Sequence, residues 1–225
     1  LRTVIELAAS VTARIPDPSA VSALCVASVC EEVVLIDAAG DPVGDAITWY
    51  DPRGLAEARS FLDGLGRDVP LSRRWPPDPT FSIFKLLWLR EHAAEQLAAA
   101  STWTDLGDFV LRGLGGELVM DWSHASRAGG FDLAARTWDP ATVEAIDIRP
   151  AFPRLVPGLT PIGRLSRTVA AAIGLPSEVT LVTGGHDHLC AAFGAGLRTT
   201  RELFLSAGTS EAHLSLLADP LEGAA

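Results

Sequence analysis

An aspartate, Asp187, lies at the junction between an apolar stretch, 179–183, and a run rich in small residues, 187–195. The first stretch predicts a buried strand and the second predicts a helix. A carboxylate at the carboxyl end of a strand can accept the proton of a substrate hydroxyl, and ligands of open α/β sheets bind outside that end. Asp187 is therefore a candidate general base. The alternative is an aspartate that caps the helix by accepting hydrogen bonds from its free N–H groups.

A second group, Gly208, Thr209 and Ser210, lies between two predicted strands, 203–206 and 212–216. Glycine allows a tight turn, and the N–H groups and hydroxyls of such a turn can bind a phosphate. The alternative is an ordinary hairpin turn, since these residue types are common there. A base and a phosphate-binding turn together indicate phosphoryl transfer from a nucleotide to an alcohol.

Two histidines, His186 and His188, flank the candidate base. Alternating residues of an extended segment can point two imidazoles the same way, which leaves a metal-dependent hydrolase using His186, Asp187 and His188 as an alternative. A zinc site needs three or four ligands, and His124 and His213 lie in unrelated sequence contexts. No metal site is therefore expected here.

Residues that could bind a sugar lie earlier in the chain. Trp49, Asp51 and Arg53 combine an aromatic ring, which can stack on a sugar, with charges that can bind hydroxyls. The alternative for them is an ion pair on a surface loop. Glu31 follows a predicted strand, where it could accept hydrogen bonds from a polyol or simply be solvated. Lys85, the only lysine of the sequence, lies on a predicted amphipathic helix and is expected to be solvated.

These residues must be positioned by an alternation of strands and helices, which indicates an α/β fold. Apolar periodicity predicts helices over 1–15, 55–65, 80–100, 104–114, 141–146 and 163–173. Apolar runs predict a buried strand over 21–29 and a hairpin from 33–37 and 46–49. Residues 117–140 show no regular pattern and are expected to be irregular.

The composition excludes several classes of partner. With 225 residues, 48% of them hydrophobic, the chain can form a sizeable core, and a net charge of −10 argues against nucleic acids and anionic membranes as partners. No apolar run approaches the ~20 residues of a membrane span. Cys25, Cys30 and Cys190 form neither a disulfide framework nor a metal-binding spacing, which favours a reducing cytoplasm.

Taken in order, several short segments resemble the FGGY family of carbohydrate kinases. They are AITWYDPR (46–53), FKLLWL (84–89), DFV (108–110), LGGE (114–117), DWSHAS (121–126), FD (131–132), WD (138–139), GLP (174–176), GGHD (184–187) and GTS (208–210). The resemblance implies the ribonuclease-H-like fold of the actin and hexokinase type. It also implies transfer of the γ-phosphoryl group of ATP, bound with Mg²⁺, to a hydroxyl of a ketose, polyol or aldonate.

By the same resemblance, Asp187 would deprotonate the attacking hydroxyl. The second phosphate-binding loop would consist of Gly208, Thr209 and Ser210. The implied sugar-binding residues are Glu31, Trp49, Asp51, Arg53 and His188. The implied partners are a small-molecule sugar and ATP, and a homodimer is left open.

Two parts of the family pattern have no counterpart in this sequence: the first phosphate-binding loop, of the Asp-x-Gly-Thr type, and most of the second domain. The expected division is an N-terminal kinase domain over 1–197 that lacks its first strands, followed by the start of the C-terminal domain over 198–225. Phosphoryl transfer needs the metal, both loops and closure of the cleft, so this polypeptide alone is expected to be inactive. A non-catalytic sugar-binding protein of the same fold is a further alternative.

Overall fold

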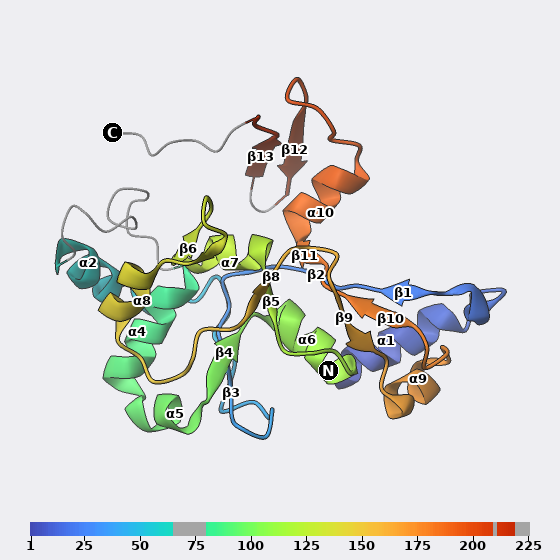
Figure 1. Ribbon diagram of the computed structural model, residues 1–225, viewed down its shortest axis with the longest axis horizontal. Helices are drawn as coiled ribbons and strands as arrows, with labels where there is room; N and C mark the ends of the chain where they lie inside the picture. The colour runs from blue at the N-terminus through green and yellow to red at the C-terminus, as the bar shows by residue number, and fades with distance from the viewer. Residues whose placement is uncertain (65–79, 209–210, 219–225) are drawn as a thin grey trace.

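Two pairs of parallel strands form the centre of the fold in the computed structural model, which describes residues 1–64, 80–208 and 211–218 (Figure 1). Strand β1 (Ala23–Leu24) pairs in parallel with β10 (Thr180–Val182), and β2 (Ala27–Ser28) pairs in parallel with β11 (Gly185–His186). Strand β9 (Pro161–Arg164) extends the first sheet in antiparallel pairing, so the strand order is β1-β10-β9. Segments far apart in the sequence therefore run side by side.

The buried strand predicted over 21–29 is wrong in two respects. Its central residues form β1 and β2, strands of 2 residues each, and these residues are exposed or half-buried. The helix predicted over 163–173 is wrong at its start, because residues 161–164 pair with β10 as a strand. Only α9 (Arg167–Ile173) is helical, and the Ser166 side chain caps it by accepting a hydrogen bond from the backbone N–H of Val169.

One hydrophobic core lies beside this first sheet. It is formed by α9, by α6 (Leu106–Leu114) and by the apolar face of α1 (Arg2–Thr12), which is followed by a 3-10 turn (Pro18–Ala20). The helices predicted over 1–15 and 104–114 are confirmed, although each is shorter than predicted. Their amphipathic pattern is what places one face of each against the core.

Further hydrophobic clusters lie around β3 (Val34–Ile36), β4 (Thr102–Thr104), α2 (Leu55–Gly64), α4 (Ser82–His92) and α5 (Ala94–Ala99). Strands β3 and β4 are antiparallel neighbours, and Trp103 of β4 is fully buried. The predicted hairpin is confirmed by antiparallel bridges between Val33 and Ile47 and between Ile36 and Pro42. The helix predicted over 80–100 is two helices, because the backbone leaves the helical region at Ala93 (φ −143°, ψ 46°).

Residues 117–140, predicted to be irregular, contain β5 (Met120–Asp121), α7 (Trp122–Ala128), β6 (Phe131–Asp132) and β7 (Thr137–Trp138). Asp121 caps α7, since its Oδ1 accepts hydrogen bonds from the backbone N–H groups of Ser123 and His124, and the helix ends at Gly129 with φ +102°. An aspartate cap and a terminal glycine are sequence signals of a short helix, so α7 was recognisable. Helix α8 (Pro140–Ile146) confirms its prediction, and β8 (Leu155–Val156) pairs in parallel with β5.

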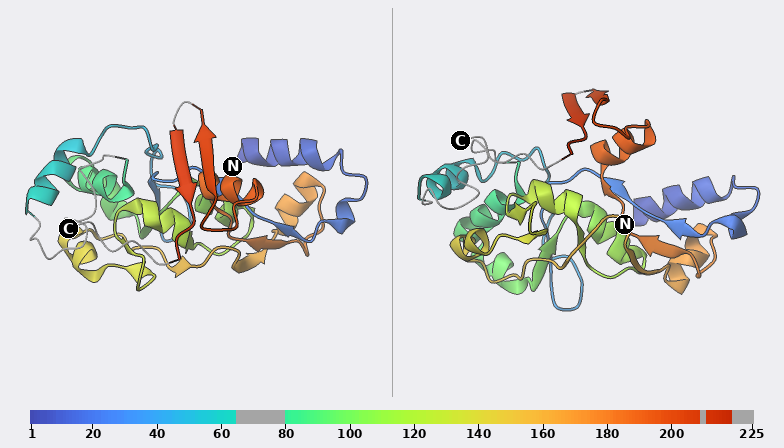
Figure 2. Two further views of the ribbon diagram at one scale, coloured as in Figure 1. Left: turned by 90° about the horizontal axis from the view of Figure 1, so that it is seen from above. Right: turned by 45° about the horizontal axis from the view of Figure 1, so that its top comes forward.

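Helix α10 (Asp187–Gly194) leads to a hairpin of β12 (Leu203–Ala207) and β13 (Glu211–Ser215), as predicted. Figures 1 and 2 show this unit projecting from the other elements. Phe193, Leu203 and Leu205 in this unit are more than half exposed. Among the described residues, no helix combines the length and the apolar character needed to cross a membrane.

Candidate active site

Asp187 and Glu31 follow neighbouring parallel strands. Asp187 comes directly after β11, and Glu31 comes three residues after the end of β2; the last residues of the two strands, His186 and Ser28, are register partners. Because the strands are parallel, both acidic residues leave the sheet at its carboxyl edge, where open α/β sheets bind ligands. Folding thus brings the candidate base and a candidate sugar-binding residue to one edge.

Asp187 is accessible, and it does not occupy the cap position of α10. That position belongs to His186, and Asp187 lies in the first turn. The Asp187 side chain is 39% exposed, and its Oδ1 accepts a hydrogen bond from the backbone N–H of His188 at 2.7 Å. Asp187 is therefore not the N-cap residue, although it accepts a hydrogen bond from one free N–H group of the helix, and its carboxylate can be reached from solvent.

The imidazoles of His186 and His188 stack on each other, with ring centroids 5.2 Å apart. Their Nε2 atoms lie 3.5 and 3.9 Å from Oδ1 of Asp187. Burial lowers the pKa of His186 to about 4, so its imidazole is neutral at pH 7. Within the described ranges, the group of three residues that could hold a metal ion lies on α6 and α7, not here. The geometry therefore does not favour the hydrolase alternative.

The segment before Asp187 is held by the start of α7. Ser123 Oγ accepts a hydrogen bond from the backbone N–H of His186 at 2.8 Å and donates one to Asp121. Gly185 has φ +136°, and an added Cβ would lie 2.7 Å from Ser123 Oγ. The positive φ and the close contact both favour glycine here. Helix α7 thus determines where β11 ends and α10 begins.

We expect Ser123→Ala to lower the free energy of unfolding by about 1–2 kcal/mol, because the half-buried N–H of His186 would lose its acceptor. Thermal unfolding measures this change. The matched control is Ser126→Ala on the same helix, whose exposed Oγ donates to the backbone oxygen of Ser123. The control should change the free energy by less than about 0.5 kcal/mol. Equal losses in the two variants would contradict the role given to Ser123.

Glu31 forms an ion pair with Arg127 of α7. Its Oε1 accepts hydrogen bonds from Nε of Arg127, at 2.7 Å, and from Nη2, and the residue is 8% exposed. Its backbone has φ +75°, which is uncommon outside glycine and is often found at functional sites. The alternative of a solvated glutamate is therefore wrong. Helix α7 contacts both the segment of Asp187 and the side chain of Glu31.

Lys85, predicted to be solvated, is fully buried. Its Nζ donates hydrogen bonds to the backbone oxygens of Glu31, at 2.8 Å, and of Thr80, at 2.5 Å. Burial lowers the pKa of Lys85 to about 8. Four acidic residues oppose this shift: Glu31, Glu32, Asp105 and Asp51. Lys85 therefore connects α4 to the segment that carries Glu31.

Because Lys85 is the only lysine of the sequence, a chain labelled with ¹³C-lysine gives a single set of lysine NMR signals. We expect these signals to titrate with a midpoint near pH 8 in the folded chain and near 10.5 in the unfolded chain. Between these values the unfolded state binds more protons, so this lysine should make stability rise with pH across that window. A folded-state midpoint at or above that of the unfolded chain would contradict the expected lowering of the pKa of Lys85 by burial.

Trp49, Asp51 and Arg53 lie between β3 and α2. Oδ2 of Asp51 is 2.8 Å from Nη2 of Arg53, and this hydrogen bond lowers the pKa of Asp51. The guanidinium of Arg53 lies over the ring of Trp88 on α4, 4.7 Å from its centroid, while Trp49 is 39% exposed. The ion pair foreseen as the alternative is therefore present. Sugar binding by these three residues stays a prediction.

Gly208 directly follows β12, and Ala207 of β12 pairs with Glu211 of β13, so residues 208–210 connect the two strands. Thr209 and Ser210 lie outside the described residues. Phosphate binding by this turn therefore stays a prediction as well.

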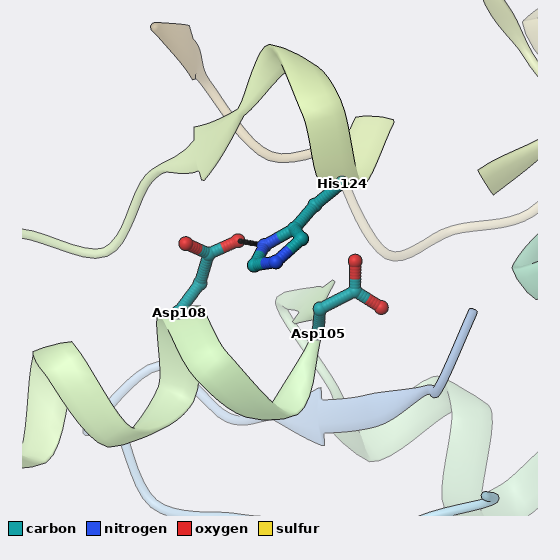
Figure 3. Close-up of side chains that lie close together, drawn as sticks. All are labelled: Asp105, Asp108 and His124. Carbon is teal, nitrogen blue, oxygen red and sulfur yellow. Dashed lines mark hydrogen bonds and ion pairs between the residues drawn. The ribbon is translucent and has the colours of Figure 1, made fainter. Parts of the chain in front are cut away.

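A buried group that the sequence analysis missed consists of Asp105 and Asp108 at the start of α6 and His124 on α7 (Figure 3). Oδ2 of Asp108 lies 3.1 Å from Nδ1 of His124. Burial raises the pKa of both aspartates. Burial alone would lower the pKa of His124, but the hydrogen bond to Asp108 and the nearby carboxylates raise it to about 9. Asp108 and His124 are 16 positions apart, so no periodic pattern in the sequence connects them.

Comparison with known proteins identifies the family. Residues 1–194 match the model of the N-terminal domain of the FGGY family of carbohydrate kinases. The chain belongs to this family. L-fuculokinase of Escherichia coli (strain K12) is 32% identical over 183 residues, which cover 79% of this chain and 38% of that protein. Gluconokinase of Bacillus subtilis (strain 168) is 25% identical over 221 residues, which cover 97% of this chain and 43% of that protein. The chain thus spans about two fifths of the length of these FGGY relatives.

Solved structures of FGGY relatives confirm the predicted fold. Gluconate kinase from Lactobacillus acidophilus superposes with a TM-score of 0.84 at 22% identity, over 93% of this chain and 43% of that one. Plasmodium falciparum glycerol kinase with ADP superposes with a TM-score of 0.74 at 19% identity, over 84% of this chain and 39% of that chain. At these identities the likeness shows the fold alone. The chain therefore has the N-terminal part of the actin- and hexokinase-type fold.

Proposed function

We propose that this chain forms the N-terminal part of a kinase that transfers a phosphoryl group from ATP to a hydroxyl of a ketose, polyol or aldonate. The observation that carries the proposal is the position of Asp187 and Glu31 at one edge of paired parallel strands, in a chain whose residues 1–194 match the FGGY family. The relatives are named L-fuculokinase, xylulose kinase and gluconokinase, and these names differ in the sugar. The proposed class of sugar is therefore kept broad.

In the proposed mechanism, Asp187 accepts the proton of the attacking sugar hydroxyl. The backbone N–H of His188 orients the carboxylate through Oδ1, which leaves Oδ2 for the substrate. Because His186 is neutral at pH 7, it can lie beside the carboxylate without forming an ion pair that would compete with the substrate. Proton transfer by a positioned carboxylate is general base catalysis.

The sugar is proposed to bind beside Asp187, at the edge where Glu31 also lies. Glu31 is already paired with Arg127, so it can accept hydrogen bonds from hydroxyls at a small cost in side-chain ordering. The exposed ring of Trp49 can stack on an apolar face of the sugar. The proposed sugar-binding residues are Glu31, Trp49, Asp51, Arg53 and His188.

ATP, when bound with Mg²⁺, supplies the phosphoryl group that is transferred. The proposed contacts of this chain with a phosphate are Gly208, Thr209 and Ser210. Their backbone N–H groups and two hydroxyls form a donor set that suits an anion. No described residue is assigned to Mg²⁺.

We further propose that residues 1–197 form the N-terminal kinase domain and that 198–225 begin the next domain. Helix α10 ends at Gly194, and the hairpin that follows contributes no residue to the three hydrophobic clusters of the described chain. The proposed location is the cytoplasm, where the free thiols of Cys25, Cys30 and Cys190 would stay reduced.

The test is a coupled assay of ADP formation from ATP with a panel of ketoses, polyols and aldonates, on the longest form of the protein that its gene encodes. Turnover with one class of sugar, dependent on Mg²⁺, is the expected result. The 225-residue chain alone is expected to be inactive. Sugar binding without turnover in the longest form would instead support a non-catalytic sugar-binding protein. The absence of both sugar binding and turnover would contradict the proposal.

A further inference from the structure

Three ionisable side chains from α6 and α7 meet in the interior of the fold. Asp105, Asp108 and His124 are each at most 2% exposed, and each offers a ligand atom within 4.8 Å of the other two. Figure 3 shows the imidazole of His124 lying between the two carboxylates. Glu32 is equally buried, and its carboxylate lies close enough to His124 and Asp105 to affect their charge states.

Several atoms of this group lack a hydrogen-bond partner among the described residues. They are both carboxylate oxygens of Asp105, Nε2 of His124 and Oε2 of Glu32. Buried polar atoms in native proteins are nearly always paired, because burial without a partner forfeits their hydration. Their concentration in one place indicates that a bound group satisfies them.

Protein groups alone do not satisfy these atoms. Neither carboxylate oxygen of Asp105 has a hydrogen-bond partner in the described part of the chain. The buried ammonium of Lys85 is directed to the backbone oxygens of Glu31 and Thr80. A cation with several coordination positions would satisfy Asp105 and His124 at once, and the buried carboxylate of Glu32 is close enough to affect the charge states of both.

Asp108 is placed to orient the imidazole. Its Oδ2 lies 3.1 Å from Nδ1 of His124, so Nδ1–H donates to Asp108. Because the pKa of His124 is raised to about 9, binding of a metal ion would release the proton from Nε2. The lone pair of Nε2, on the opposite side of the ring, is then available to a cation. In metal sites the second ring nitrogen of a histidine ligand is commonly held by a carboxylate in this way.

We propose that this chain binds one divalent first-row metal ion, foremost Zn²⁺, through Asp105 and Nε2 of His124, with Glu32 as a further ligand and Asp108 holding the imidazole. A set of imidazole and carboxylate ligands suits Zn²⁺. Zinc bonds to nitrogen and oxygen are about 2.0–2.2 Å long, so the side chains must close in on the ion by on the order of 1 Å.

The proposed site is closed to solvent, as structural zinc sites are, so its role is to join α6 to α7. Helix α7 carries Ser123, which holds the segment before Asp187, and Arg127, which holds Glu31. The metal would therefore stabilise the scaffold of the candidate active site without contacting the substrate. This inference goes beyond the proposed kinase function.

The test uses the longest form of the protein, expressed with zinc in the medium and purified with a histidine-free tag and without chelators. We expect mass spectrometry of the elements to find about one zinc per chain. Removal of the metal by dialysis against a chelator should lower the melting temperature by about 5–15 °C, as expected for a tightly bound ligand, and Zn²⁺ should restore it. Mn²⁺ and Mg²⁺ are tested in parallel, and a response to Mg²⁺ alone would contradict a site with a histidine ligand.

The variants Asp105→Asn and His124→Gln should retain less than about one tenth of the metal and lose the thermal response, because each removes one direct ligand. The matched controls are Asp45→Asn and His213→Gln, which change exposed residues of the same types. Both control variants should keep the bound metal and the thermal response to it. If Asp105→Asn and His124→Gln do not fold, X-ray absorption at the zinc edge of the wild-type protein identifies the ligand atoms instead. The spectrum should show nitrogen and oxygen ligands and no sulfur.

Three results would overturn the proposal: no bound metal together with no thermal response, zinc retained by folded forms of both ligand variants, or sulfur in the first coordination shell. All readouts are made without ATP or sugar. A protein without kinase activity can therefore still confirm the metal site, and an active kinase can still lack it.

Discussion

Asp187→Asn is expected to lower the kcat of the sugar kinase reaction by about 10²–10⁴-fold, because asparagine cannot accept the proton of the attacking hydroxyl. This loss corresponds to about 3–5 kcal/mol in the activation free energy. The substitution nearly conserves shape, and the amide oxygen can still accept the hydrogen bond from the backbone N–H of His188. The KM for the sugar should therefore change little. Steady-state kinetics on the longest form of the protein separates the two parameters.

The matched control is Asp45→Asn, which changes an exposed aspartate outside the candidate site and should leave kcat unchanged. Because the Asp187 side chain is 39% exposed, the melting temperature of Asp187→Asn should stay within about 2 °C of the wild type. A folded Asp187→Asn variant with kcat within about threefold of the wild type would remove Asp187 from the role of base.

Gly184→Ala is expected to destabilise the fold by about 3 kcal/mol or more. An added Cβ would lie 2.0 Å from the carbonyl oxygen of Val26 and 2.6 Å from its carbonyl carbon. Gly184 precedes β11 and Val26 precedes β2, so relief of this contact would separate the two strands that lead to Asp187 and Glu31. The melting temperature should fall by about 6–12 °C, and sugar binding should weaken with it.

The control for this variant is Gly194→Ala, at the end of α10, where an added Cβ meets no atom within 4 Å. Alanine is a better helix former than glycine, so this variant should gain about 0.5–1 kcal/mol. The two glycine-to-alanine substitutions are thus expected to have opposite signs. A melting temperature of Gly184→Ala within about 2 °C of the wild type would contradict the close backbone contact.

Several elements could be predicted from the sequence because patterns over a few residues determine them. Helices α1, α6 and α10 follow from apolar periodicity and small residues, and the hairpin of β12 and β13 follows from two strand patterns around a glycine-containing turn. Asp187 could be singled out because the change from strand to helix is itself a local signal. The family could be recognised because many short motifs occur in the right order, and the match over residues 1–194 confirms it.

Other features could not be predicted because they depend on partners far away in the sequence. Lys85 was expected to be solvated, since lysines are rarely buried, and only folding supplies the backbone oxygens of Glu31 and Thr80 that satisfy it. The strands within 117–140 contain 2 residues each, which is too short for any periodic pattern. Residues 163–164 fit the start of a helix as well as the end of β9, because only the pairing with β10 distinguishes the two.

By itself, the sequence determined the family, the alternation of strands and helices, and Asp187 as the candidate base. Only the tertiary structure decided that Glu31 lies at the same edge as Asp187, that Arg127 and Lys85 hold Glu31, and that a group of carboxylates and a histidine is buried between α6 and α7. The physical reason is one of range. Periodicity and capping act over a few residues, whereas the pairing of β2 with β11 and the contact of α6 with α7 join segments that the chain keeps far apart.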